Sequence, residues 1–205
     1  MRPAHRPVAL TAVLGGFLLG VLDFIWIKYV PYPFGNLGNS SAVWAVAAFF
    51  FGFWVRSGWL RAAVGAAVGL VVAVPSYYVA AALIQGDEWA VLWAPPSLLW
   101  MFFGVLAGVL FGIGGTWARG RGWQQILGPA LPGAVLFAEG GLEIRRIGDP
   151  NYGNDPLWDA LIRITLGVLA VVLASRTNRQ RAFALATALP LALAGLAAFL
   201  LGGFR

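Results

Sequence analysis

Two carboxylates near residue 140, Glu139 and Glu143, have the spacing and the apolar surroundings that proton chemistry requires. Side chains four residues apart lie on one face of a helix. Two carboxylates there repel each other unless cations neutralise them or one of them keeps its proton. Arg145 and Arg146 follow directly and are candidates to neutralise them. A protonated carboxyl would instead suit a general acid or a proton-coupled transporter. The glycines at 140–141 leave open whether the helix continues to Glu143 or turns it into a loop.

Four further charged side chains stand within or at the ends of apolar segments. A charge in the bilayer costs about 2.5 to 3.5 kcal/mol on insertion scales and usually faces the bundle interior or a watery cavity. Asp23 either belongs to a site or forms an interfacial ion pair with Lys28. Asp159 and Arg163 are spaced to pair directly on a helix, as a structural staple or to orient a substrate.

Aromatic side chains accompany these charges, and acids combined with aromatic faces are typical of cation recognition. We therefore predict a ligand-binding site that draws on Asp23, Trp26, Tyr77, Tyr78, Trp100, Glu139, Glu143, Asp159 and Arg163. If the protein is an enzyme, Glu139 and Asp23 are the candidate catalytic acids.

Several kinds of chemistry lack their motifs. The chain has no cysteine, and its single histidine is His5 in the N-terminal tail, so we expect no metal site. No phosphate-binding Gly-Lys-Ser or Gly-Lys-Thr sequence and no Gly-x-Ser-x-Gly sequence occurs, which argues against an ATPase and a serine hydrolase. We expect no cofactor.

The elements that must position these residues are apolar helices. Of the 205 residues, 60% are hydrophobic and 11% charged, against about 45–50% apolar and about 25% charged in soluble domains. About 20 apolar residues span a bilayer as a helix. Seven segments predict an all-α, polytopic membrane bundle of seven transmembrane helices in one domain covering residues 1–205, and the fifth segment is short and interrupted by prolines. They are Val8 to Val30, a short second segment that starts near the cap signal at residues 39–41 and ends at Val55, Ala62 to Gln85, Pro95 to Trp117, Gly128 to Glu139, Leu157 to Ser175 and Ala182 to Phe204.

The distribution of charge predicts how this bundle is oriented. Basic residues near span ends collect on the cytoplasmic side. With seven spans, one side receives Arg2, Arg6, Arg56, Arg61, Arg119, Arg121, Arg176, Arg179 and Arg181. The other side receives Lys28, Arg145, Arg146, Arg163 and Arg205, together with all eight acids and all five tyrosines. We therefore expect a cytoplasmic N-terminus, an outer C-terminus and a site that opens outward. The net charge of +6 then reports topology and not nucleic-acid binding.

Glycines at four-residue spacing mark close helix packing. The fullest set is Gly104, Gly108 and Gly112. Such a face lets another helix approach closely. It packs either within the monomer, which we favour, or as the seam of a homodimer.

Size, short loops, Ala/Gly/Val richness and 13 arginines to one lysine resemble small uncharacterised polytopic membrane proteins of actinobacteria and other GC-rich bacteria. This resemblance implies a multi-pass protein of the bacterial cytoplasmic (inner) membrane, in contact with the lipid bilayer. A fainter architectural similarity is to the small seven-helix membrane terpene cyclases. It implies a protonation-initiated enzyme in which Asp23, Glu139, Trp26, Tyr77, Tyr78 and Trp100 are the analogous parts.

Three functions follow as hypotheses. The leading one is a membrane protein that binds or transports a small amphiphilic or cationic molecule through an outward-opening, acidic, aromatic-lined cavity. The second is a membrane-bound enzyme acting on a lipid-soluble, prenyl-like substrate. The third is a structural subunit of a membrane complex.

Overall fold

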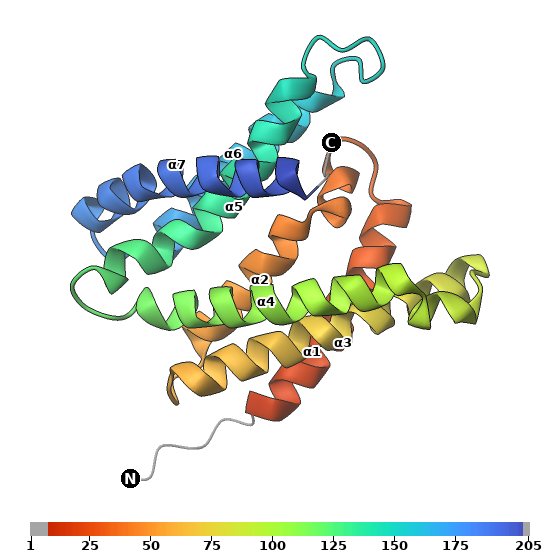
Figure 1. The fold of residues 1–205 in the computed structure, drawn as a ribbon, viewed down its shortest axis with the longest axis horizontal. Helices are drawn as coiled ribbons and strands as arrows, with labels where there is room; N and C mark the ends of the chain where they lie inside the picture. Colours follow the sequence, from red (N-terminus) through yellow and green to blue (C-terminus); the bar gives the residue numbers. More distant parts are fainter. Residues whose placement is uncertain (1–7, 203–205) are drawn as a thin grey trace. The chain divides into compact units, whose positions relative to one another are not determined.

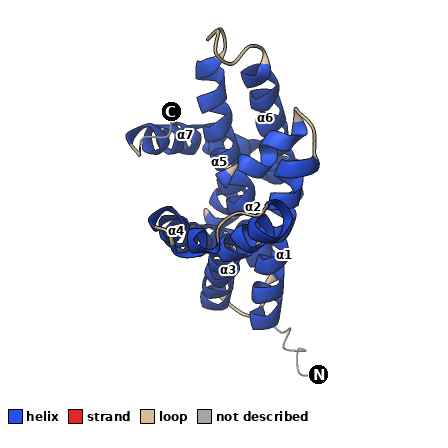
Figure 2. Ribbon diagram, turned by 90° about the vertical axis from the view of Figure 1, so that its right-hand side faces the viewer, coloured by secondary structure: helices blue, strands red, loops and turns tan. Residues whose placement is uncertain are grey.

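The structure is a computed structural model that describes residues 8–202, and every regular element in this range is helical (Figure 2). Seven α-helices and two short 3₁₀ helices follow one another along the chain (Figure 1). They are α1 (Val8–Tyr29), η1 (Phe34–Asn39), α2 (Ser41–Trp54), α3 (Trp59–Gln85), η2 (Trp89–Trp93), α4 (Pro95–Trp117), α5 (Gln124–Arg146), α6 (Asp155–Ala174) and α7 (Asn178–Leu201).

The chain forms two compact units. Unit 1 contains residues 1–30 and 47–116, and unit 2 contains residues 31–46 and 117–205, so that the division falls within α2. The prediction of one domain stays a prediction.

Small residues bring the helices of unit 1 together. A Cβ atom added at Gly16 would meet the backbone of Gly69, and one added at Gly20 would meet the backbone of Ala73. The backbones of α1 and α3 are therefore in direct contact, which small residues at a helix interface allow.

The α4 glycines are used in the same way. Gly104, Gly108 and Gly112 are buried, and Cβ atoms added there would meet α3 at Leu70, Ala67 and Ala62. Packing within the monomer is therefore correct for this face. The homodimer seam predicted as the alternative is already covered by α3 of the same chain.

Helices α5, α6 and α7 pack around a core of alanines and one valine in unit 2. The buried members are Ala130, Ala134, Val171, Ala184 and Ala188. Close approach of α5 to α6 recurs along their length, because Cβ atoms added to glycines 133, 167 and 140 would meet Val171, Phe137 and Ile164.

Helix α5 is longer than its predicted span of Gly128 to Glu139. It begins at Gln124 and continues through glycines 140–141 to Arg146, with Pro129 and Pro132 inside it. A proline removes the hydrogen bond to the carbonyl four residues earlier. For Pro129 that carbonyl belongs to Gln125, and it accepts instead from Gln180 Nε2 of α7 at 2.6 Å. The lost bond is thereby replaced, and the helix persists.

Five of the α-helices in residues 8–202 are long and apolar enough to cross a membrane, namely α1, α3, α4, α6 and α7. This agrees with a multi-pass membrane protein that contacts the bilayer. It does not reach the seven spans predicted, since α2 has only 14 residues, or about 21 Å, and α5 does not qualify. The predicted end of the last span, Phe204, and the arginines at 2, 6 and 205 lie outside the described residues.

The close contact of α1 with α3 makes Gly20→Ala a sharp test of this packing. We expect the substitution to destabilise the protein by roughly 1–3 kcal/mol, the usual cost of overpacking. Gly15→Ala is the matched control, because a Cβ at Gly15 has no neighbour within 4 Å. Thermal unfolding of the detergent-solubilised protein measures both. Equal midpoints for the two variants would contradict the arrangement.

Candidate functional site

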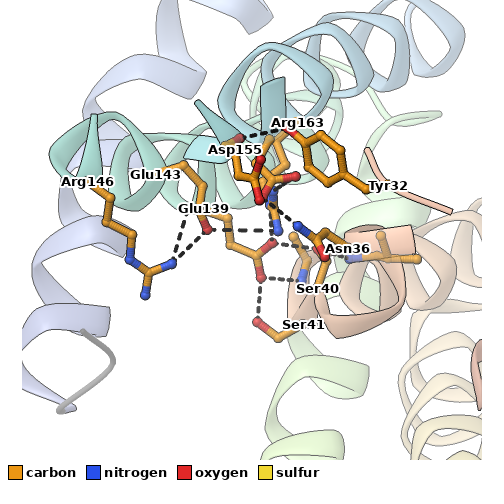
Figure 3. A network of polar contacts seen from close by, with 12 residues as sticks. Tyr32, Asn36, Ser40, Ser41, Glu139, Glu143, Arg146, Asp155 and Arg163 are labelled. Atoms are coloured by element: carbon orange, nitrogen blue, oxygen red, sulfur yellow. Dashed lines mark hydrogen bonds and ion pairs between the residues drawn. The ribbon is translucent and has the colours of Figure 1, made fainter. Parts of the chain in front are cut away.

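A buried network of charged and polar side chains lies in unit 2, and Glu139 of α5 is at its centre (Figure 3). Its Oε1 accepts hydrogen bonds from the Ser41 hydroxyl at 2.7 Å and from the Ala42 backbone N–H at 2.8 Å. Its Oε2 accepts from the Ser40 hydroxyl at 2.5 Å and from Arg163 Nε at 3.4 Å. Only 8% of Glu139 is exposed, so the protein itself provides the partners that water would otherwise supply.

The first turn of α2 explains why the carboxylate sits there. The N–H groups at the start of a helix lack partners within the helix, and this end carries about half a positive charge. Ser40 caps one of these groups, since its hydroxyl accepts from the Val43 N–H at 3.3 Å. Glu139, which is 97 residues away in sequence, takes the Ala42 N–H. The carboxylate therefore acts as a second cap that comes from a different helix.

Arg163 of α6 joins three carboxylates. Its Nε lies 3.4 Å from Glu139, its Nη1 lies 3.5 Å from Asp159, and its Nη2 lies 3.9 Å from Glu143. Arg163 is 5% exposed and Asp159 6%. A buried guanidinium is tolerated when carboxylates surround it in this way. The predicted pairing of Asp159 with Arg163 is therefore present.

The network extends to the segment that precedes α2. Asn36 Nδ2 of η1 donates to Asp159 Oδ2 at 2.8 Å. The Tyr32 hydroxyl donates to the backbone carbonyl of Asp155 at 3.2 Å. Desolvation, together with the negative charges of Asp155 and Asp159, raises the pKa of Tyr32, so its hydroxyl stays a neutral donor to higher pH than usual.

At the other end of the network, Glu143 is held by Arg146. Arg146 Nη1 donates to both oxygens of Glu143 at 3.1 Å, and its guanidinium lies 5.2 Å from the centre of the Tyr152 ring. Glu143 thus lies on the helix and not in the loop. The two carboxylates of α5 are neutralised by different arginines, Glu139 by Arg163 and Glu143 by Arg146.

The network carries one formal negative charge in excess. Glu139, Glu143 and Asp159 contribute three negative charges, whereas Arg146 and Arg163 contribute two positive ones. An uncompensated charge in a low-dielectric setting is unfavourable. The arrangement can therefore accept a proton or a small cation. In the part of the chain that the structure describes, no group of His, Cys, Asp or Glu side chains is arranged to hold a metal ion.

The remaining predicted site residues belong to unit 1. Asp23 is buried on α1, and Tyr77 of α3 lies within reach of its charge. The Tyr77 ring packs edge-on against Phe24 at 5.4 Å. It also packs edge-on against Tyr78 at 5.3 Å. Tyr77 thus packs against Phe24, the neighbour of Asp23 in sequence, and Tyr78 packs against Tyr77.

Lys28, the predicted partner of Asp23, donates to the carbonyl of Ile84 at 3.3 Å and lies 5.9 Å from the Phe24 ring centre. Trp26 and Trp100 have exposed side chains. The nine predicted residues therefore do not form one cluster within either unit. Four of them are in contact in unit 2, namely Glu139, Glu143, Asp159 and Arg163.

Sequence reasoning missed the residues of the network that come from the 31–46 segment. Asn36, Ser40, Ser41 and Tyr32 contact carboxylates or backbone about 100 residues further along the chain. The cap signal at residues 39–41 identified the serines only as the start of a helix. The available signal was a helix cap preceded by a segment that contains prolines and asparagines. That signal does not identify the acid that completes the cap.

Five helices able to cross a membrane, one of which, α6, carries buried and paired charges, define a helical multi-pass membrane protein. The chain belongs to the family DUF6518, a family of unknown function, whose model matches residues 2–203. Comparisons with curated proteins and with solved structures found no match.

Removing the central carboxylate tests the network. We expect Glu139→Ala to destabilise the protein by about 3–5 kcal/mol, because it leaves Arg163 buried with one partner fewer and uncaps α2. Glu143→Ala should cost less, since Arg146 is partly exposed. Unfolding midpoints in detergent give both values.

A double-mutant cycle then isolates the pair. Arg163→Met combined with Glu139→Ala should cost less than the sum of the two single changes, because neither charge is left alone. Strict additivity would contradict a direct interaction between Glu139 and Arg163.

Proposed function

We propose that this protein binds a small amphiphilic cation and transports it across the membrane, with the unit 2 network as the polar part of the site. The observation that carries the proposal is the charge balance of that network, in which three carboxylates face two arginines. A cationic ligand or a proton would compensate the remaining negative charge. Alternation between the two is the basis of proton-coupled exchange.

The Tyr32 side of the network has the chemistry that a cation needs. Tyr32, Asp155 and Asp159 lie near one another, and the side chains of Tyr32 and Asp155 are exposed. An aromatic face beside carboxylates attracts organic cations through charge and through the ring quadrupole. We infer that the ligand enters here, while Arg163 and Glu139 remain paired with each other behind this entry.

The short helix α2 also supports a transport role. Transporters commonly place discontinuous helices at their binding sites, where helix ends meet charged groups. Here the start of a 14-residue helix meets Glu139. Both oxygens of Glu139 receive an N–H donor, from Ala42 and Arg163, which suits an acceptor. This geometry gives less support to the alternative in which Glu139 donates a proton to a prenyl substrate.

Equilibrium dialysis with protein in nanodiscs tests the binding step. Tetraphenylphosphonium is the probe, and tetraphenylborate, of the same shape and opposite charge, is its matched control. We expect nanodiscs that contain the protein to bind more of the cation than empty nanodiscs do. Asp159→Asn should weaken this binding about tenfold, or ~1.4 kcal/mol.

Two further variants keep this result interpretable. Asp155→Asn removes an exposed charge and should also weaken binding, whereas Glu88→Gln removes an exposed acid of unit 1 and should not. If the anion bound as tightly as the cation, or if all three variants behaved alike, the proposal would fail. Uptake of radiolabelled tetraethylammonium into proteoliposomes then tests transport.

We also propose that the chain crosses a bacterial cytoplasmic membrane seven times, with its N-terminus inside. The segregation of basic residues supports this topology, because α2 and α5 must both cross for the alternation to hold. The absence of cysteine from the chain makes the test direct, since any introduced cysteine is the only label.

Single cysteines at Ser57 and Asn151 should report opposite sides. Both positions are exposed in loops, one between α2 and α3 and the other between α5 and α6. We expect a membrane-impermeant maleimide to label Asn151→Cys in intact cells and Ser57→Cys only after permeabilisation. Labelling of both in intact cells would rule out this topology.

A further inference from the structure

A second polar feature of unit 2 adjoins the network where α5 and α7 end, and it shares Arg146 with the network. A half-open cavity of about 450 Å³ is lined by Leu142, Arg145 and Arg146 of α5 and by Leu200 of α7. Its volume falls in the usual range for small-ligand sites. Two guanidinium groups and two leucines therefore share one cavity.

The two arginines differ in how they are held. Arg146 is fixed by Glu143 and lies against the Tyr152 ring. Arg145 is exposed, and no hydrogen bond or ion pair joins its guanidinium to any residue within 8–202. Basic residues in the last turn of a helix offset its dipole, and one arginine suffices for that. The cavity thus offers a cationic group whose donors are unused.

The cavity lies at the C-terminal end of an apolar helix. α7 is long and apolar enough to cross the membrane, and Leu200 is in its last turn. Beside it, Leu201 is 90% exposed, and Ile144 of α5 is also exposed, so apolar surface continues outward from the cavity. The charged group of an amphiphile could contact the arginines here, while its apolar chain contacts the neighbouring leucine and isoleucine side chains.

We infer that this cavity binds the phosphate group of an acidic phospholipid, with Arg145 and Arg146 on the phosphate oxygens and Leu142 and Leu200 against the start of the acyl chains. Guanidinium groups bind phosphate oxygens bidentately. Basic pockets beside membrane helices are suited to anionic headgroups. This site is separate from the cation site proposed above, because its charge is of the opposite sign and its residues, apart from Arg146, are different.

Native mass spectrometry of the protein in a nonionic detergent tests the inference. The probes are dioleoylphosphatidylglycerol and dioleoylphosphatidylcholine, which have the same chains and differ in net charge. We expect the anionic lipid to be retained more strongly, and Arg145→Gln to reduce that preference about fivefold, the order of one basic contact. Arg145 is exposed, so this variant leaves the packed interior intact.

Arg121→Gln is the matched control, because Arg121 is also exposed and lies in unit 2 but away from the cavity residues. It should leave the preference unchanged. Leu200→Gln should weaken retention of both lipids.

Three results would overturn the inference: equal retention of the two lipids, equal effects of Arg121→Gln and Arg145→Gln, or binding of inorganic phosphate as tight as that of phosphatidylglycerol. The last would assign the site to free phosphate. None of these outcomes depends on tetraphenylphosphonium binding, so the two proposals fail or stand separately.

Discussion

The contact on which the organisation of unit 2 depends is that of one carboxylate, Glu139, with the first turn of α2 and with Arg163. A helix that starts inside the protein has backbone donors that need acceptors, and a buried guanidinium needs a counter-charge. Glu139 meets both needs at once. The 31–46 segment, α5 and α6 are held in register because this one side chain reaches all of them.

Small residues make that contact possible. Glycines at 133, 140 and 167 allow α5 and α6 to pack closely, which brings the acids of one helix within ion-pair distance of Arg163 on the other. Backbone packing and ion pairing therefore reinforce each other. The core of the network is buried, with Arg163 Nη1 held to Asp159 by an ion pair and not by a hydrogen bond, whereas its Tyr32 edge and its Arg146 edge are the more exposed parts.

Much of the helical architecture was predictable, because apolar runs of the length of a bilayer and pairs four residues apart are local signals. The pair Asp159–Arg163 is of this kind. The partners of Glu139 at the start of α2 were not predictable, since they lie 97 to 99 residues away and only folding brings them together. The length of α5 was underestimated for a related reason. Its prolines suggest a break, and the residue that compensates, Gln180, is on another helix.

Two of the residues that satisfy polar groups of α5 come from helices synthesised after it, which affects how the protein folds during synthesis. As α5 leaves the ribosome, Glu139 lacks its counter-charge and the carbonyl freed by Pro129 lacks its donor, because Arg163 and Gln180 have yet to be synthesised. A segment with such unmet polar groups is retained poorly in hydrocarbon by itself. α5 therefore completes its polar contacts only after α6 and α7 have been made, so the C-terminal helices stabilise the helix that precedes them.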